Sequence, residues 1–396
     1  MSRDSEFIQK LGQTNQSPYL IDVDRADGIY IYDKANKAYM DMIAGVAVSN
    51  IGHNHPKIIK ALKNQIDKHL HVMVYGEFIQ DAQLAFAQRL VNLLPSTLNS
   101  IYTVNSGTEA NEAALKLAKR VTGRTELVSF RGSYHGSTHG SMSVSGNEVK
   151  KQAFRPLLPD VRFLQHNSIS DLEQITTKTA GVIIETIQGD AGVRVPSHEF
   201  MLALRKRCTE VGALLIFDEI QCGMGRAGKL FAFEHFNVVP DVLTLGKALG
   251  GGMPIGALVS SHENLWEFTY NPMLGHITTF GGHPVVCASA NAFLEIMETE
   301  VNLEEVERLG ALLESIVGQS KEIKEIRRIG MMFAFDMESF ERVEKVVKRC
   351  LEKGLISFWF LSHPYSFRLS PPLTITEDEI RKAGEIILSS IQETAE

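Results

Sequence analysis

The chain has 396 residues, 44% hydrophobic and 22% charged, with a net charge of −7. These values indicate a globular protein of about two domains, and the absence of a long basic run excludes a nucleic-acid surface. The polar N-terminus, the lack of an apolar run of about 18 residues and four widely spaced cysteines predict a cytoplasmic protein with reduced thiols.

The first 50 residues predict an N-terminal arm. Residues 27–42 alternate apolar and polar side chains around a turn at Asp33–Asn36, which is typical of a two-stranded hairpin. Residues 45–56 predict a loop. Its histidines, His53 and His55, have no further ligand at a useful spacing, so no metal site is expected.

From residue 56 onward, short apolar strands alternate with helices. The strand candidates are 101–104, 127–130, 161–164, 181–184, 213–217, 242–245 and 256–259. Helices are predicted by apolar stripes, which are Leu84 to Leu94, Ala110 to Val121, and Leu204 with Cys208 and Val211. Apolar strands separated by helices indicate a mostly parallel sheet that is covered on both faces. The predicted fold class is therefore α/β.

The pattern changes after Pro284. Residues 285–320 are largely helical, 326–337 predict one or two strands, and 341–354 predict a helix closed by Gly354. Thr376 and Glu379 form a capping box for a last helix. We therefore expect a large domain at 51–285, and a smaller α+β domain made of 1–50 and 286–396.

Two groups at strand ends could carry chemistry, because ligands of open α/β sheets bind at the carboxyl ends of strands. Ser106, Gly107 and Thr108 follow one strand and offer a phosphate site at a helix N-terminus, or a plain helix cap. Asp218 directly follows a buried strand, where a carboxylate needs a partner. Its alternative role is structural, as a helix cap or in an ion pair with Arg226.

Lys247 is the third candidate and follows strand 242–245 inside a glycine-rich turn. Burial there would lower the pKa of its amine and make it a nucleophile, whereas the alternative is a surface lysine in a flexible loop. A P-loop is excluded because Asp241 and Ala248 stand where that motif needs a glycine and a hydroxyl residue. Phosphate donors, a buried acid and a buried lysine together are the set that pyridoxal phosphate requires.

Six motifs carry a family resemblance, namely NSGTEANE, SYHG, the E-x-I-Q-G segment, IFDEIQCGMGRAG, TLGKALGGGMPIGA and HITTFGGHP. They appear in order over nearly the whole chain, which resembles the class III (subgroup II, omega-type) pyridoxal-phosphate aminotransferases of fold type I. The resemblance implies Lys247 as the Schiff-base lysine and Asp218 as the partner of the pyridinium nitrogen. It implies a homodimer with a shared active site. The other implied cofactor-binding residues are Ser106, Gly107, Thr108, Tyr134, His135, Glu185, Gln221 and, from the second subunit, Thr279.

The segment FRLSPPLTIT resembles the one whose arginine binds the substrate carboxylate, which maps to Arg368; taken alone, Arg368 would be a surface residue. Asp190 stands where omega-type members have a glutamate that covers this arginine, and Thr186 stands where proline is usual. The aromatic residues 358–360 predict packing of the small domain rather than a substrate channel.

The implied reaction is a ping-pong transfer of an amino group from N-acetylornithine or ornithine to 2-oxoglutarate. A transaminase of 4-aminobutyrate, lysine or diamines is an alternative. An aminomutase of the glutamate-semialdehyde type is another, because the same fold and residues serve both reactions.

Overall fold

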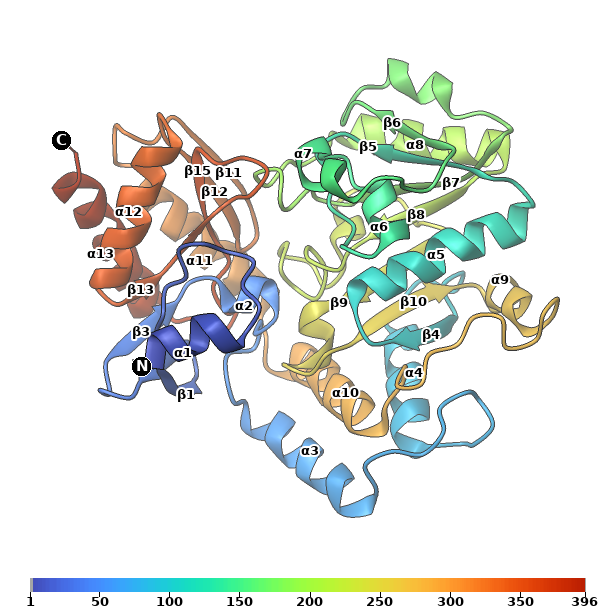
Figure 1. Ribbon diagram of the computed structural model, residues 1–396, viewed down its shortest axis with the longest axis horizontal. Coiled ribbons are helices and arrows are strands. Elements are labelled where there is room, and N and C mark those ends of the chain that lie inside the picture. The colour runs from blue at the N-terminus through green and yellow to red at the C-terminus, as the bar shows by residue number, and fades with distance from the viewer. Residues whose placement is uncertain (1–2, 396) are drawn as a thin grey trace.

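The computed structural model describes residues 3–395 and shows two lobes (Figure 1). The larger lobe contains one seven-stranded sheet in the order β4-β10-β9-β8-β7-β5-β6. Its strands are β4 (Ser100–Val104), β5 (Glu126–Phe130), β6 (Val161–Leu164), β7 (Thr179–Glu185), β8 (Leu214–Asp218), β9 (Val242–Gly246) and β10 (Gly256–Ser260). Only β10 runs antiparallel to its neighbours, so the predicted mostly parallel sheet is confirmed.

Alternate residues of the central strands enter two apolar clusters, as expected for a sheet buried on both faces. One cluster joins Ile183 and Ile216 to alanines of helix α5 (Gly107–Thr122). The other joins Ile184 and Phe217 to Phe200 of helix α8 (His198–Val211). The two helices therefore cover opposite faces of the sheet. The polar groups at the carboxyl edge of the sheet lie between these two apolar layers.

Helix α5 matters most for the site, because its first turn lies at that edge. The Ser106 hydroxyl caps the helix by accepting a hydrogen bond from the amide of Glu109 at 3.4 Å. Gly123 ends the helix with a left-handed φ of 67°, a value that suits glycine. The predicted alanine stripe, including Ala113 and Ala114, is fully buried between these ends.

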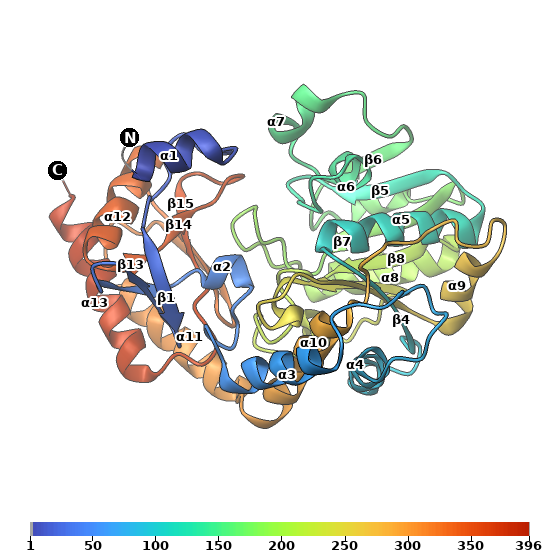
Figure 2. The same ribbon diagram turned by 60° about the horizontal axis from the view of Figure 1, so that its bottom comes forward.

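The remaining helices of the larger lobe are α3 (Pro56–Lys68), α4 (Asp81–Asn92), α6 (His139–Val144), α7 (Glu148–Lys151), α9 (His262–Trp266) and α10 (Pro284–Thr299). Helix α10 packs against both α3 and α4 (Figure 2). The domain boundary at residue 285 stays a prediction, and this packing favours moving it to the end of α10. Within residues 3–395, no helix is long and apolar enough to cross a membrane.

The smaller lobe holds two four-stranded sheets. The first consists of β1 (Val23–Asp27), β2 (Tyr30–Asp33), β3 (Ala38–Asp41) and β13 (Leu355–Ile356); the second of β11 (Glu325–Ile329), β12 (Met332–Asp336), β15 (Ser366–Leu369) and β14 (Phe358–Trp359). The helices are α1 (Arg3–Lys10), α2 (Ala44–Ala47), α11 (Leu303–Val317), α12 (Phe340–Glu352) and α13 (Glu377–Glu393). The predicted hairpin is β2–β3, and the predicted capping box opens α13. Because β13 pairs with β3, the N-terminal arm and the C-terminal third share a sheet.

Asn50 and the buried Arg226 join distant parts of the chain. The Arg226 guanidinium donates to the Asn50 side chain at 2.5 Å and to the carbonyl oxygens of Met331 and Pro371. The Asn50 amide in turn donates to the carbonyl oxygen of Met224 at 2.8 Å. Arg226 is thus committed to this network, and the possible ion pair between Arg226 and Asp218 does not form.

We expect Asn50→Ala to lower the free energy of unfolding by about 1–3 kcal/mol, because it leaves a buried guanidinium with fewer acceptors. Urea unfolding at neutral pH measures the change. Asn64→Ala, at an exposed position of α3, is the matched control and should stay within about 0.5 kcal/mol of the wild type. Equal effects of the two substitutions would contradict a structural role for the network.

His166 follows β6 and lies against Phe200, with 6.2 Å between the ring centroids. Burial, with a smaller contribution from the Arg194 charge, lowers the pKa of His166 to about 4. The unfolded chain therefore binds a proton here at a higher pH than the folded protein does. This contribution to stability is present above about pH 6.5 and is lost as the pH falls towards about 4.

We therefore expect the wild type to lose up to about 3 kcal/mol more stability than His166→Gln between pH 7 and pH 4. Urea unfolding across this range measures the difference. His262→Gln, at an exposed position, is the control and should follow the wild-type curve. Parallel curves for the wild type and His166→Gln would contradict the assignment.

Candidate active site

A cavity of about 280 Å³ opens at the carboxyl ends of β8 and β9, beside the first turn of α5. Eight of the residues that the sequence predicts for the site line it, namely Gly107, Thr108, Tyr134, His135, Glu185, Asp218, Gln221 and Lys247. They come from five separate stretches of the chain. The fold therefore brings the three strand-end candidates together in one place.

Asp218 ends β8 and is almost completely buried. The Asn111 side-chain amide donates to its Oδ2 at 2.8 Å, and Nδ1 of His135 lies 2.8 Å from the same oxygen. The backbone amide of Ile220 donates to its Oδ1 at 3.1 Å. These partners replace the water that a buried carboxylate loses, so Asp218 can present a fixed negative charge to the cavity.

Lys247 begins a short 3-10 turn directly after β9 and is partly buried. Burial lowers the pKa of its amine, although the charges of Asp218 and Glu185 act in the opposite direction. Its φ of 45° is left-handed, which is unfavourable for a residue other than glycine and is often found at functional sites. The structure thus provides the desolvated amine that the sequence predicted in this turn.

Glu185 ends β7 and organises the wall of the cavity. Its carboxylate accepts hydrogen bonds from the backbone amides of Tyr134 at 2.8 Å and Gly189 at 2.9 Å. Burial raises the pKa of Glu185 to about 7, with a smaller effect from the charge of Asp218. Glu185 therefore fixes the backbone that presents the Tyr134 ring to the cavity.

The opposite end of the cavity is formed by the first turn of α5. Gly107 and Thr108 lie there, where unpaired backbone amides favour an anion. The neighbouring Gly136 has a φ of +131°, and a Cβ atom on it would lie 2.2 Å from Oγ1 of Thr108. Glycine is therefore required for this close approach, and the end of the cavity stays open for a small anion.

Two predicted cofactor residues do not line the cavity. Ser106 uses its hydroxyl to cap α5, so its side chain has a structural role in this chain. Thr279 is exposed and lies in the segment 270–282, away from the cavity of its own chain. Its contribution to the site of a second subunit stays a prediction.

Arg368 lies in β15 and is buried, unlike the surface residue that its local sequence suggested. Its guanidinium lies between the rings of Phe358 and Phe360, at 5.6 and 5.5 Å from the centroids. Trp359 packs against Phe340 and stacks on Phe358, with 6.0 and 4.5 Å between the ring centroids. The aromatic residues therefore pack the small lobe, as predicted, and Phe358 and Phe360 also flank the arginine.

Among residues 3–395, the guanidinium of Arg368 donates no hydrogen bond to an acceptor. Its buried Nε has no hydrogen-bond partner there. Its charge also contributes to lowering the pKa of Lys247, which places it within electrostatic reach of the cavity. Asp190 does not bond it. Instead, Asp190 accepts from Lys150 and from the Ser362 hydroxyl, so the arginine-covering geometry is absent.

Sequence reasoning missed Asn111, which bonds Asp218, and Lys150, which bonds Asp190. Asn111 had a visible signal, because it is a polar residue on the buried side of a helix that is otherwise lined by alanine. Its carbonyl accepts from the Thr244 hydroxyl at 2.8 Å, so both ends of the amide are used. Lys150 had no local signal, because its partner is 40 residues away.

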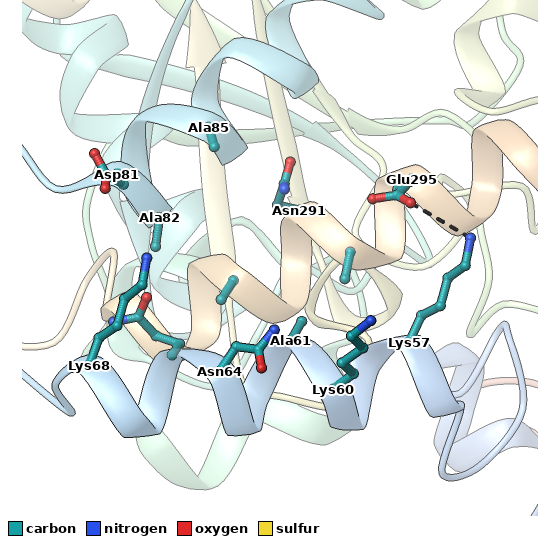
Figure 3. Close-up of a pocket in the computed structure, with 13 residues that line it drawn as sticks. Lys57, Lys60, Ala61, Asn64, Lys68, Asp81, Ala82, Ala85, Asn291 and Glu295 are labelled. Carbon is teal, nitrogen blue, oxygen red and sulfur yellow. Dashed lines mark ion pairs between the residues drawn. The ribbon is translucent and has the colours of Figure 1, made fainter.

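A second groove of about 460 Å³ lies between α3, α4 and α10 (Figure 3). Lys57, Lys60 and Lys68 line it, and Lys57 pairs with Glu295 at 3.6 Å. None of the predicted catalytic or binding residues reaches this groove. The chemistry is therefore concentrated in the cavity at the sheet edge.

Comparison with known proteins agrees with this geometry. The profile of the class-III aminotransferases matches residues 11–391, almost the whole chain. This chain is a class-III aminotransferase. The acetylornithine aminotransferase of Methanopyrus kandleri is 36% identical over 96% of each chain. The [LysW]-aminoadipate semialdehyde/glutamate semialdehyde transaminase of Sulfolobus acidocaldarius is 35% identical over 92% of each chain.

Solved structures show the same fold in other aminotransferases. The ornithine aminotransferase of Toxoplasma gondii superposes with a TM-score of 0.91 at 28% identity, covering 99% of this chain and 94% of that one. A transaminase from the marine bacterium Virgibacillus gives a TM-score of 0.92 at 24% identity, covering 99% and 98%. The predicted fold type is therefore confirmed for this class-III aminotransferase.

The cofactor of this aminotransferase is pyridoxal 5'-phosphate, as the family implies. The cavity fits its three recognisable parts. The end of the cavity beside Gly107 suits a phosphate. It stays open because residue 136 is a glycine, and a side chain at that position would collide with Thr108. Asp218 offers a buried carboxylate that could pair with a protonated ring nitrogen, and Lys247 offers an amine with a lowered pKa.

Proposed function

We propose that this aminotransferase moves the terminal amino group of N-acetylornithine or ornithine to 2-oxoglutarate. The observation that carries the proposal is Arg368, a buried guanidinium between two aromatic rings that has no acceptor among the described residues. A buried cation without a partner is costly, and a bidentate substrate carboxylate would supply one. Both donors and the acceptor carry such a carboxylate.

The relatives support this choice of donor. The M. kandleri relative is an acetylornithine aminotransferase, and the structurally similar T. gondii protein is an ornithine aminotransferase. Transaminases of 4-aminobutyrate, lysine or diamines keep the same reacting residues. Diamines lack a carboxylate for Arg368, so the geometry favours an amino-acid donor over them.

The roles of the cavity residues follow from their places. Pyridoxal phosphate, when bound, withdraws electrons from the carbon that carries the donor's amino group. The backbone amides at Gly107 and Thr108 would hold its phosphate, together with Thr279 of a second subunit. Asp218 would keep the ring nitrogen protonated, while Tyr134, His135 and Gln221 would confine the ring.

Lys247 would both bond the cofactor and move the proton. Burial lowers the pKa of its Nζ, which favours the unprotonated and nucleophilic form of the amine. Once released from the cofactor, Nζ would be free to take the proton from the carbon that bears the donor's amino group and to deliver it to the cofactor carbon that receives the amino group. Arg368 holds the donor carboxylate and keeps this carbon within reach.

We also propose a cytoplasmic homodimer. The segments near residues 70–79 and 273–280 expose a group of large apolar side chains, which are Leu70, Val72, Met73, Phe78, Ile79, Met273, Leu274, Ile277 and Phe280. Single exposed apolar residues are normal on a protein surface, but this group is larger than that. A second copy of the chain would bury it. All four cysteines are buried and unpaired, which suits a reducing compartment.

A panel of half-reactions tests which amino donor the enzyme uses. The holoenzyme is mixed with N-acetylornithine, ornithine, 4-aminobutyrate, lysine or putrescine, and the absorbance change to the amine form of the cofactor is followed. We expect fast conversion with N-acetylornithine or ornithine and reversal by 2-oxoglutarate. Faster conversion by putrescine than by either amino acid would contradict the role of Arg368.

The same panel separates the aminomutase alternative. An aminomutase would convert glutamate 1-semialdehyde to 5-aminolevulinate without any 2-oxo acid, whereas the proposed transaminase needs the acceptor for every second half-reaction. Turnover of the semialdehyde alone, at a rate above that of the donor–acceptor pair, would replace the proposed function.

A further inference from the structure

Asp190, in the loop after β7, has two cations nearby but bonds only one. Its carboxylate accepts from Nζ of Lys150 and, at 2.5 Å, from the Ser362 hydroxyl. Burial lowers the pKa of Arg368, and the charge of Asp190 opposes this effect, so the two groups lie within electrostatic reach. The side chains of Asp190 and Lys150 are only 11% and 28% exposed, so little water screens them.

The position of Lys150 is set by contacts between the two lobes. Asn147 caps the short helix α7 by accepting from the amide of Val149 at 3.0 Å. The side-chain amide of Asn147 donates to the Ser362 hydroxyl at 2.9 Å. Ser362 belongs to the segment between β14 and β15, the strand that carries Arg368. Helix α7, the Asp190 loop and this segment are therefore fastened together.

Lys150 also lies beside the cavity. Its Nζ is 5.1 Å from the centroid of the Tyr134 ring, which lines the cavity. Lying between this ring and Asp190, the Lys150 cation gives the carboxylate a partner other than Arg368. Without that partner, the carboxylate would be free to pair with Arg368, on which its charge already acts.

We propose that Lys150 is a positioning residue that holds Asp190 away from Arg368 and so keeps the guanidinium open for the substrate carboxylate. In this role Lys150 acts through Asp190 and determines affinity for carboxylate-bearing substrates. The inference rests on the proposed role of Arg368 in the reaction.

Equilibrium binding of glutarate to the holoenzyme tests the inference. Glutarate has carboxylates but no amino group, so its dissociation constant requires no turnover, and a failed donor panel would leave this measurement valid. Isothermal titration calorimetry compares the wild type with Lys150→Met, Lys150→Arg, Asp190→Asn and the double variant Lys150→Met/Asp190→Asn.

We expect Lys150→Met to weaken glutarate binding about tenfold, because the released carboxylate covers Arg368. In the Asp190→Asn background the same substitution should change affinity by less than about twofold, because no carboxylate is left to release. Lys150→Arg keeps the pairing charge and should bind like the wild type. In steady-state assays, Lys150→Met should raise the KM for 2-oxoglutarate and leave kcat within about twofold.

Three results would overturn the proposal. Equal losses from Lys150→Met in both backgrounds would show that Lys150 acts on the ligand directly or through its field. No loss in either background would show that Asp190 does not respond to Lys150. Absence of glutarate binding to the wild type would show that Arg368 is not open. The Lys150→Arg and double variants keep the test valid if Lys150→Met alone folds poorly.

Discussion

Replacing Lys247 with alanine will lower turnover by about 10⁴-fold or more, because the substitution removes both the nucleophilic amine and the group that moves the proton. The protein should still fold, since the side chain faces the cavity and is not part of the apolar core. It should hold pyridoxal phosphate only weakly and without a covalent link. Steady-state transamination and absorbance spectra measure the two effects.

Lys229→Ala is the matched control for this prediction. Lys229 also follows a glycine in a glycine-rich stretch, but it is exposed and does not line the cavity. Its replacement should leave turnover unchanged. Transamination by Lys247→Ala at a rate near that of the wild type would refute the assignment of the catalytic lysine.

Asp218→Asn should lower kcat by at least about 100-fold while reducing the free energy of unfolding by no more than about 1.5 kcal/mol. The amide keeps the shape of the carboxylate but loses the negative charge that keeps the ring nitrogen protonated. Its partners Asn111 and His135 remain, so the packing is largely conserved. Kinetics and urea unfolding of the same preparations give the comparison.

Asp241→Asn is the control for this prediction, because it should affect stability and not the rate. Asp241 precedes β9 and accepts from Arg205 and the amide of Leu215, away from the cavity. This substitution should lower stability and leave kcat nearly unchanged. If Asp218→Asn loses stability and rate by comparable free energies, Asp218 has a structural role instead.

Local patterns predicted most of the large sheet. The largely apolar runs at 181–184 and 242–245 lie within β7 and β9, because strands buried on both faces of a sheet lack the usual alternation of apolar and polar residues. Weak elements were missed. The mostly exposed β1 and the two-residue β13 and β14 bury too little side chain to leave a pattern.

Partner choice within the site was less predictable. The sequence placed Asp218 and Lys247 at strand ends, but it offered Arg226 as a neighbour because that residue is only eight positions away. The fold instead sends Arg226 to Asn50 and brings Asn111 and His135 to Asp218. Likewise, Asp190 meets Lys150 only because helix α7, the loop after β7 and a segment of the smaller lobe converge. Such contacts depend on tertiary structure and have no local signature.

Reductive trapping tests whether Lys247 forms the covalent bond to pyridoxal phosphate. The holoenzyme is treated with borohydride and digested, and the peptides are mapped by mass spectrometry. We expect a single pyridoxyl-labelled peptide whose modified residue is Lys247. A label on another lysine, or none at all under conditions where the enzyme is active, would contradict this expectation.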